Sequence, residues 1–166
     1  MSGIGRRASV AIEFAILAPV MLMLGGGMYV LGSLLHVNST VNKLAMQYAV
    51  SFANCSDTSV GACGTELAQY ETAPAIKNIF PQLYSAELTL TMAQAIMNGT
   101  TPTVEYPVGG TLTAAQTTAM QAVVASGQTG VVVTATYVFY PLVLQPLMAP
   151  FIGSSITVSY TVAQLK

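Results

Sequence analysis

The chain has 166 residues, a length that favours one domain plus an N-terminal segment. Charged residues make up 7% of the sequence, against about 25% in ordinary soluble domains. The five Lys and Arg residues are too few to neutralise a row of phosphates, which argues against a nucleic-acid partner. Apolar residues reach 53% and recur along the whole chain, which argues against disorder.

Residues 14–35 read FAILAPVMLMLGGGMYVLGSLL and carry no charge. A bilayer core of about 30 Å requires roughly 20 helical residues, so the run is long enough to cross it. Pro19 and the glycines at 25–27 are tolerated in membrane helices. These glycines either let a second helix approach closely or only add flexibility. A cleaved secretory signal would have a shorter apolar core and a small-residue cleavage site, which residues 33–38 do not supply.

The basic residues near this segment indicate its orientation. Arg6 and Arg7 precede the apolar run, and the next basic residue, Lys43, lies well beyond it. The positive-inside rule then places the N-terminus in the cytoplasm and the chain beyond His36 outside the membrane.

Glu13 lies directly against the apolar run. A carboxylate at a membrane edge is costly unless it is paired or reaches the interface. Glu13 therefore either extends to the cytoplasmic boundary or meets a positive partner inside the bilayer. In an assembly of packed helices, the free amino terminus of a neighbouring chain would be such a partner.

Beyond the membrane segment, apolar residues continue at near-helical spacing, at Val37, Val41, Leu44, Met46, Tyr48 and Phe52. A helix over residues 10–53 would be about 66 Å long, roughly twice the thickness of the bilayer core. We therefore expect its second half to pack on an exported domain.

Cys55 and Cys63 bracket the polar segment CSDTSVGAC and are the only cysteines in the sequence. In an oxidising compartment, an isolated pair at this spacing favours a disulfide, with a stabilisation of about 2.5 kcal/mol for so short a loop. The alternatives are two unpaired thiols or a metal site, and a metal site would need further His or Cys residues nearby.

The remaining elements follow from local patterns. Residues 65–79 read as a helix interrupted by Pro74, and residues 87–92 alternate as a strand. Asn98-Gly99 is a turn signal, although the residues after it are not a clean hairpin partner. Thr113 and Gln116 fit a capping box for a helix that Gly127 would end. Residues 131–140 and 155–162 read as strands that pair antiparallel, the second with Ile156, Val158, Tyr160 and Val162 on one face against the long helix.

Catalysis by side chains requires convergent titratable groups, and the sequence shows none. His36 is the only histidine and falls near the outer membrane face. Asp57 is the only aspartate and lies between the two cysteines, where a turn is favoured. The other carboxylates, at Glu66, Glu71, Glu87 and Glu105, have no paired spacing. We therefore expect no enzyme activity, no cofactor and no metal.

Residues 6–19, RRASVAIEFAILAP, resemble the opening of TadE-like pseudopilins, minor pilins of the tight adherence branch of type IV pili. The resemblance implies that prepilin peptidase cuts between Ala8 and Ser9, which makes Glu13 the fifth residue of the mature chain. The adjacent Phe14 also fits the family. The residue before the cut is usually Gly in this family, whereas here it is Ala8. Residues 131–164, with Tyr140-Pro141-Leu142, more weakly resemble the closing strand pair of TadE-like domains.

These observations predict an α+β chain, in which a long N-terminal transmembrane helix extends into a small pilin-like exported domain with an antiparallel sheet. The expected organisation is a cytoplasmic leader at 1–8, a transmembrane helix at 9–36, an exported extension of the helix at 37–53 and a periplasmic or extracellular α+β domain at 54–166.

The resemblance implies a minor pilin or pseudopilin that takes part in initiating, capping or regulating a tight adherence pilus. It would lie in the bacterial inner membrane, spanning it once, and become extracellular when incorporated into the pilus. Its partners would be other pilins, prepilin peptidase, the inner-membrane assembly platform and the lipid bilayer. The alternative is a single-pass envelope protein whose exported domain binds a cell-wall or secreted partner.

Overall fold

The computed structural model describes residues 3–55, 63, 83, 85–140 and 154–166, with side chains described from residue 12 onward. The chain divides into two compact units. One comprises Met1–His36 and Tyr140–Ile156, and the other comprises Val37–Phe139 and Thr157–Lys166. The helix α1 (Gly3–Ala53) contributes residues to both units.

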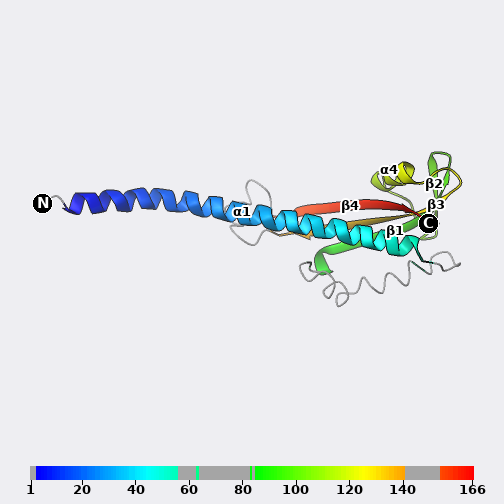
Figure 1. Cartoon of the computed structure of the whole chain (residues 1–166), viewed down its shortest axis with the longest axis horizontal. Helices are drawn as coiled ribbons and strands as arrows, with labels where there is room; N and C mark the ends of the chain where they lie inside the picture. The colour runs from blue at the N-terminus through cyan, green and yellow to red at the C-terminus, as the bar shows by residue number, and fades with distance from the viewer. Residues whose placement is uncertain (1–2, 56–62, 64–82, 84, 141–153) are drawn as a thin grey trace. The chain divides into compact units, whose positions relative to one another are not determined.

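The first element, α1, is one unbroken helix, coloured blue to cyan in Figure 1. It ends at Ala53, as the apolar spacing predicts, but it begins at Gly3 and not at residue 10. The earlier start has a simple reason, because extending an existing helix adds one hydrogen bond for each residue fixed and residues 3–9 contain no proline. Pro19 lies inside the helix, where it removes one backbone donor without ending the helix.

Within its compact unit, the second half of α1 buries a single stripe of side chains. The buried residues of this half are Val37, Thr40, Val41, Leu44, Ala45, Tyr48, Ala49 and Phe52. They recur every three or four positions, so they share one face of the helix. Met46, expected in this stripe, is exposed instead, because two residues after Leu44 the helix has turned by about 200°.

The four strands form one sheet with the order β2-β1-β3-β4. Their bounds are β1 (Leu88–Asn98), β2 (Thr101–Tyr106), β3 (Thr129–Phe139) and β4 (Ile156–Leu165). The central strand β1 pairs antiparallel with both β2 and β3. The hydroxyls of Thr134 and Thr161 lie 2.9 Å apart and the backbone N–H of Lys166 donates to Thr129 O at 3.0 Å. Between these two contacts the residue number falls along β3 while it rises along β4. The two strands therefore run antiparallel, as predicted.

At the β1–β2 edge the sheet contains a longer strand and one more strand than the sequence predicts. A one-turn 3-10 helix, η1 (Ser85–Glu87), precedes β1, and β1 runs on to Asn98 where the alternation predicted an end near residue 92. Gly99, with φ +65°, forms the predicted turn, and Asn98 pairs with Thr101 across it. The hairpin partner β2 was not predicted because it contains Pro102, a residue that sheets tolerate on an edge strand.

Thr113 caps the helix α4 (Ala114–Val123) as the sequence predicts. The backbone N–H of Gln116 donates to Thr113 Oγ1 at 3.3 Å, and the Thr113 N–H donates to Gln116 Oε1 at 2.9 Å. This reciprocal pair satisfies donors that a helix start leaves without intrahelical partners. The helix ends at Val123 and not at Gly127, because Val124 adopts an extended conformation and is buried.

The two helices contact opposite faces of the sheet. Ala163 of β4 belongs to the buried cluster formed with Met120 of α4 and Val132 of β3. Tyr160, an odd number of positions away on β4, contacts α1 instead. Since neighbouring strand residues point to opposite faces, one face packs on α4 and the other on α1. Tyr160 thus lies on the predicted helix-facing side, and the α+β fold with an antiparallel sheet is confirmed.

Three predicted features lie outside the described residues. The helix expected over residues 65–79 and Asp57 both fall there, as do Pro141 and Leu142 of the C-terminal resemblance.

Gly130 is the glycine where a larger residue would do most harm. A Cβ at this position would collide with the Val124 side chain and lie 3.1 Å from the backbone oxygen of Gln164. We expect Gly130→Ala to lower the free energy of unfolding by about 1–3 kcal/mol, because a rigid strand leaves no room for the added methyl. Thermal unfolding followed by circular dichroism measures the change.

The matched control is Val108→Ala, since Val108 is 90% exposed and its truncation should change stability by less than about 0.5 kcal/mol. Equal melting temperatures for the Gly130→Ala variant and the wild type would contradict the predicted packing between α4 and β3.

Candidate membrane and assembly helix

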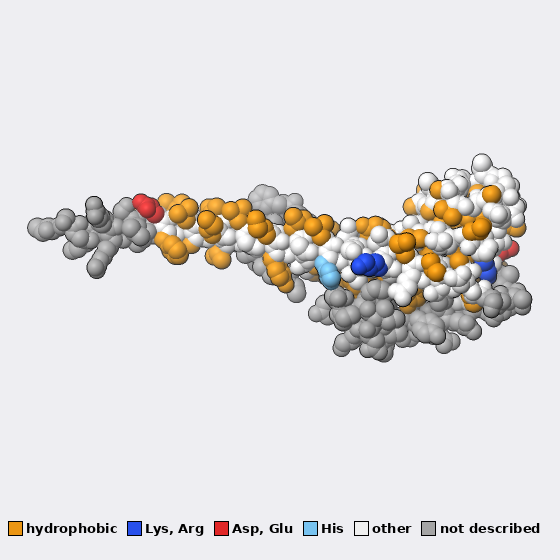
Figure 2. Space-filling model, in the orientation of Figure 1, with side chains coloured by type: hydrophobic (Ala, Val, Ile, Leu, Met, Phe, Trp, Pro, Cys, Tyr) orange, Lys and Arg blue, Asp and Glu red, His pale blue; other side chains and the backbone are white. Residues whose placement is uncertain are grey.

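Glu13 and Phe14 lie at the start of the described side chains of α1, and both are exposed, Phe14 by 72%. From Ile12 to Leu35 the exposed large side chains are almost all apolar, and Figure 2 shows them in orange along this part of the helix. Glu13 is the only Asp, Glu, Lys or Arg between residues 12 and 35. The predicted juxtaposition of one carboxylate and a long apolar helix is therefore present.

The exposed apolar residues of this segment lie on every side of the helix. Met21, Leu22, Met23 and Leu24 are consecutive and are all exposed by about half or more. Because successive residues of an α-helix point about 100° apart, four in a row cover the whole circumference. Such a surface is unfavourable in water and suits hydrocarbon. Ile12–Ala53 holds a candidate membrane span by length and composition.

The glycines of this segment leave open space on the helix surface. A Cβ built at Gly25, Gly27 or Gly32 meets no atom within 4 Å. Both expectations for the glycines at 25–27, close approach of a second helix and simple flexibility, are compatible with this geometry.

The expected processing and topology residues lie on the first turns of α1. The backbone of Arg6, Arg7, Ala8 and Ser9 is helical, and their side chains fall outside the described part of the chain. Their expected roles in orientation and cleavage remain predictions.

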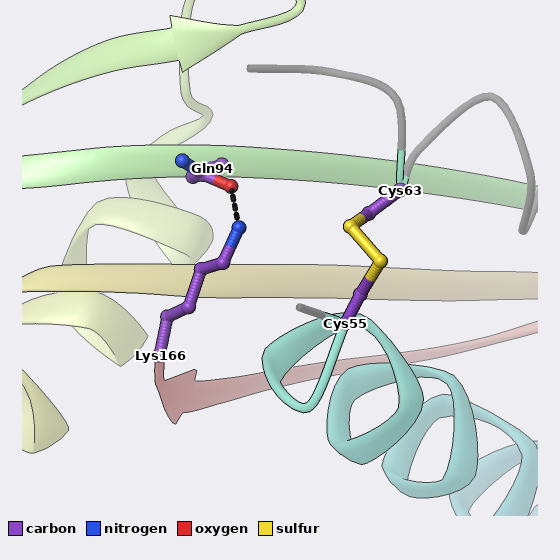
Figure 3. Close-up of a disulfide and its surroundings, with 4 residues drawn as sticks. All are labelled: Cys55, Cys63, Gln94 and Lys166. Carbon is purple, nitrogen blue, oxygen red and sulfur yellow. Dashed lines mark hydrogen bonds between the residues drawn. A yellow bond between two sulfur atoms is a disulfide. The ribbon is translucent and has the colours of Figure 1, made fainter. Parts of the chain in front are cut away.

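Cys55 and Cys63 form the predicted disulfide, with their Cα atoms 5.9 Å apart. Figure 3 shows Cys55, just beyond the end of α1, turned toward Cys63. Cys63 is buried and Cys55 is partly exposed. The bond joins the end of the long helix covalently to the chain that follows it, which confirms the pairing and excludes two free thiols in this structure.

A polar network near this disulfide was not predicted from the sequence. Lys166 Nζ donates to Gln94 Oε1 at 2.8 Å, the contact drawn in Figure 3. Gln94 Nε2 in turn donates to Glu105 Oε2 at 2.9 Å. Gln94 is buried, so both ends of its amide need partners. The only sequence signal was a glutamine inside an otherwise apolar and Thr-rich strand.

A second contact missed by sequence reasoning joins α1 to the sheet. The hydroxyl of Tyr160 donates to Asn38 Oδ1 at 2.7 Å. Phe52 of α1 also packs edge-on against Tyr106 of β2, with ring centroids 6.3 Å apart. The second half of α1 is therefore fixed to the domain by a specific hydrogen bond and by a ring contact, as well as by its buried stripe.

Among the described residues, no group of three or more His, Cys, Asp and Glu lies close enough together to hold a metal ion. His36 is exposed on α1, while Glu87 and Glu105 are partly buried in the domain. The feature that the described residues do offer is the exposed apolar surface of α1 between Ile12 and Leu35.

In the comparison with known protein families, residues 8–49 match the family described as TadE-like protein. The match covers about a quarter of the chain and lies wholly within α1. It confirms the resemblance stated for the N-terminal segment. Residues 131–164 lie outside the match, so the second resemblance remains a prediction. Searches against curated proteins and against solved structures give no significant match.

Removing the disulfide should destabilise the domain. We expect the double variant Cys55→Ser/Cys63→Ser to lose about 2.5 kcal/mol of unfolding free energy, because the unfolded chain gains the freedom of the opened loop. Chemical unfolding of the purified chain, with and without reductant, measures the effect. The reduced wild type should behave like the double variant, and a variant as stable as the oxidised wild type would contradict a stabilising role for the bond.

Proposed function

We propose that this chain is a minor pilin or pseudopilin of a tight adherence pilus, where it takes part in initiating, capping or regulating assembly. The observation that carries the proposal is the coincidence of two facts on one helix. The TadE-like family match covers residues 8–49, and the same helix presents apolar side chains on all sides in its first half and packs on an α+β domain in its second.

The apolar length of α1 suits one crossing of the inner membrane. Residues 14–35 would span about 33 Å as a helix, close to the bilayer core of about 30 Å. In the proposed organisation, residues 1–8 are a cytoplasmic leader, 9–36 the transmembrane helix, 37–53 its exported extension and 54–166 the exported domain. Arg6 and Arg7 retain the N-terminus in the cytoplasm.

Glu13 would set the axial register between subunits. Prepilin peptidase would cut between Ala8 and Ser9, and the new amino group of Ser9 on one chain would pair with Glu13 of its neighbour. Ser9 and Glu13 are four residues apart, so the pairing favours an offset of about 6 Å, or one helical turn, between adjacent helices. A subunit at another offset would leave a buried charge without its partner, which costs several kcal/mol.

The same arrangement indicates which molecules the chain would contact. The exposed apolar surface of residues 12–35 would contact lipid before assembly and other pilins after it. Prepilin peptidase and the inner-membrane assembly platform would act on the chain in turn. The role proposed for the chain is structural and not enzymatic.

Processing is the first test. Mass spectrometry of the chain purified from cells with an active tight adherence system should show a mass lower by residues 1–8. Ala8→Gly, which restores the usual family residue, should be cut at least as completely. An intact Arg6-Arg7 tip in functional protein would contradict the pilin proposal and favour the alternative, a single-pass envelope protein that uses α1 only to hold its domain at the membrane.

Glu13 is the second test. Glu13→Ala should insert into the membrane normally, because it removes a charge from an apolar helix, yet it should be absent from sheared pili. Immunoblots of membrane and pilus fractions measure both outcomes. The control is Glu87→Ala, which removes a carboxylate from the domain and should leave incorporation unchanged. Normal incorporation of Glu13→Ala would contradict the register pairing.

A further inference from the structure

Three chemical groups that can react with one another meet at the side chain of Gln94. Lys166 Nζ donates to Gln94 Oε1 at 2.8 Å, and Gln94 Nε2 donates to Glu105 Oε2 at 2.9 Å. A buried amide needs hydrogen-bond partners, but neutral side chains, backbone groups or water usually supply them. Here the two partners are an amine and a carboxylate, which are the nucleophile and the proton carrier that the exchange of one amide for another requires.

A β-bulge lies where the carboxylate meets this amide. Gln94 of β1 is opposite Tyr106 of β2, and the next residue of β1, Ala95, is opposite Val104. Glu105 is therefore the extra residue of the bulge, and bulges redirect side chains that a regular strand would place elsewhere. The break in register between β1 and β2 thus coincides with the contact between Glu105 and Gln94.

The amine reaches Gln94 from the far side of the neighbouring strand. Lys166 directly follows β4, and β3 lies between β4 and β1. The backbone N–H of Lys166 donates to Thr129 O of β3 at 3.0 Å, which holds the residue beside the sheet. Figure 3 shows the lysine side chain extended from there toward Gln94. The amine is therefore held at both ends, by its own backbone and by Gln94 Oε1.

The distance between the amine and the amide carbon is close to that required for attack. Lys166 Nζ is 2.8 Å from Gln94 Oε1, and a C=O bond is about 1.23 Å long, so Nζ is at most about 4.0 Å from Cδ. Reacting atoms in a near-attack arrangement are about 3–3.5 Å apart, so a shift of roughly 1 Å or less is sufficient. Gln94 is buried whereas Lys166 is exposed, so water can take a proton from the amine while the amide is shielded from hydrolysis.

We propose that Lys166 and Gln94 form an intramolecular amide bond, and that Glu105 carries the proton that this reaction moves. The Lys166 ammonium first loses a proton to water, and the lone pair of Nζ then attacks Gln94 Cδ, which moves an electron pair of the C=O bond to Oε1. Glu105 takes a proton from Nζ and passes it to Nε2. The C=O bond forms again as the Cδ–Nε2 bond breaks, and Nε2 leaves as ammonia. The reaction needs no oxidant, reductant or further reactant.

One carboxylate can serve both nitrogens. In the tetrahedral intermediate, Nζ and Nε2 are bonded to the same carbon, and Glu105 has two oxygens that can accept a proton. The Glu105 contact with Nε2 is already present before the reaction. Glu105 is therefore placed to protonate the group that leaves.

The bond would join the residue after β4 to the central strand β1, with β3 between them. An amide bond is not broken by reductant, in contrast to the disulfide between Cys55 and Cys63. The three strands would then stay linked when the sheet opens. The proposal does not depend on a role in a pilus, so it can fail while the proposed function holds.

The test is to cut the chain between the two joined residues. The full chain is purified from bacterial cells in detergent, reduced, denatured and cleaved after glutamate. Glu87 and Glu105 are the glutamates on either side of Gln94, so cleavage separates residues 88–105 from residues 106–166. In the wild type the two fragments should remain joined, and mass spectrometry should show their summed mass reduced by one ammonia. Two separate fragments of unmodified mass would overturn the proposal.

Three variants assign the roles. Lys166→Arg keeps the positive charge but cannot lose a proton to become a nucleophile, so its two fragments should separate. Glu105→Gln cannot carry the proton, so the intact chain should retain the ammonia. Lys43→Arg, on the exposed side of α1, is the matched control and should give joined fragments as the wild type does.

Joined fragments from Lys166→Arg would overturn the proposal, because another group would then form the link. Full loss of ammonia from Glu105→Gln would overturn the role of Glu105 as the proton carrier. Separate fragments from Lys43→Arg would also contradict the assignment, because Lys43 would then be required for the bond. The result for the wild type holds whether or not each variant folds.

Discussion

One helix carries two different kinds of surface along its length, and the packing of the described domain follows from the second of them. A helix satisfies the N–H and C=O groups of its own backbone internally, so the same helix can continue from hydrocarbon into water without a break. Its side chains cannot do the same. In α1 they change from mostly exposed apolar residues between Ile12 and Leu35 to a single buried stripe from Val37 onward. The sheet supplies the surface that this stripe requires.

The sheet is in turn built to be covered on both faces. Its alternating residues give one apolar layer under α4, centred on Met120 and Val132, and another facing α1. Polar contacts within this arrangement are specific. The amide of Gln94 is buried between Lys166 and Glu105, and a shift of one residue in the strand register would turn that amide to the other face and leave it without partners. The network therefore favours one register.

Much of this could be predicted because the signals are local. The end of α1 at Ala53, the capping box at Thr113, the disulfide and the antiparallel β3–β4 pair all follow from spacing or from short motifs. The hairpin partner β2 was missed because Pro102 reads as a strand breaker, which an edge position tolerates. The Tyr160–Asn38 bond was missed because it joins residues 122 positions apart, which no local pattern encodes. For the candidate site, the family motif indicated Glu13, and the structure adds that the helix behind it exposes apolar side chains on every side between Met21 and Leu24.

The contact between Asn38 and Tyr160 has a consequence for the order in which the molecule forms. The stripe on α1 is synthesised long before β4, the strand that completes its hydrogen-bonded contact. Bringing such distant segments together is slow compared with forming local structure. In the proposed organisation, the apolar stripe would therefore leave the membrane before its covering strand, and the domain would close only after β4 had followed it across the bilayer.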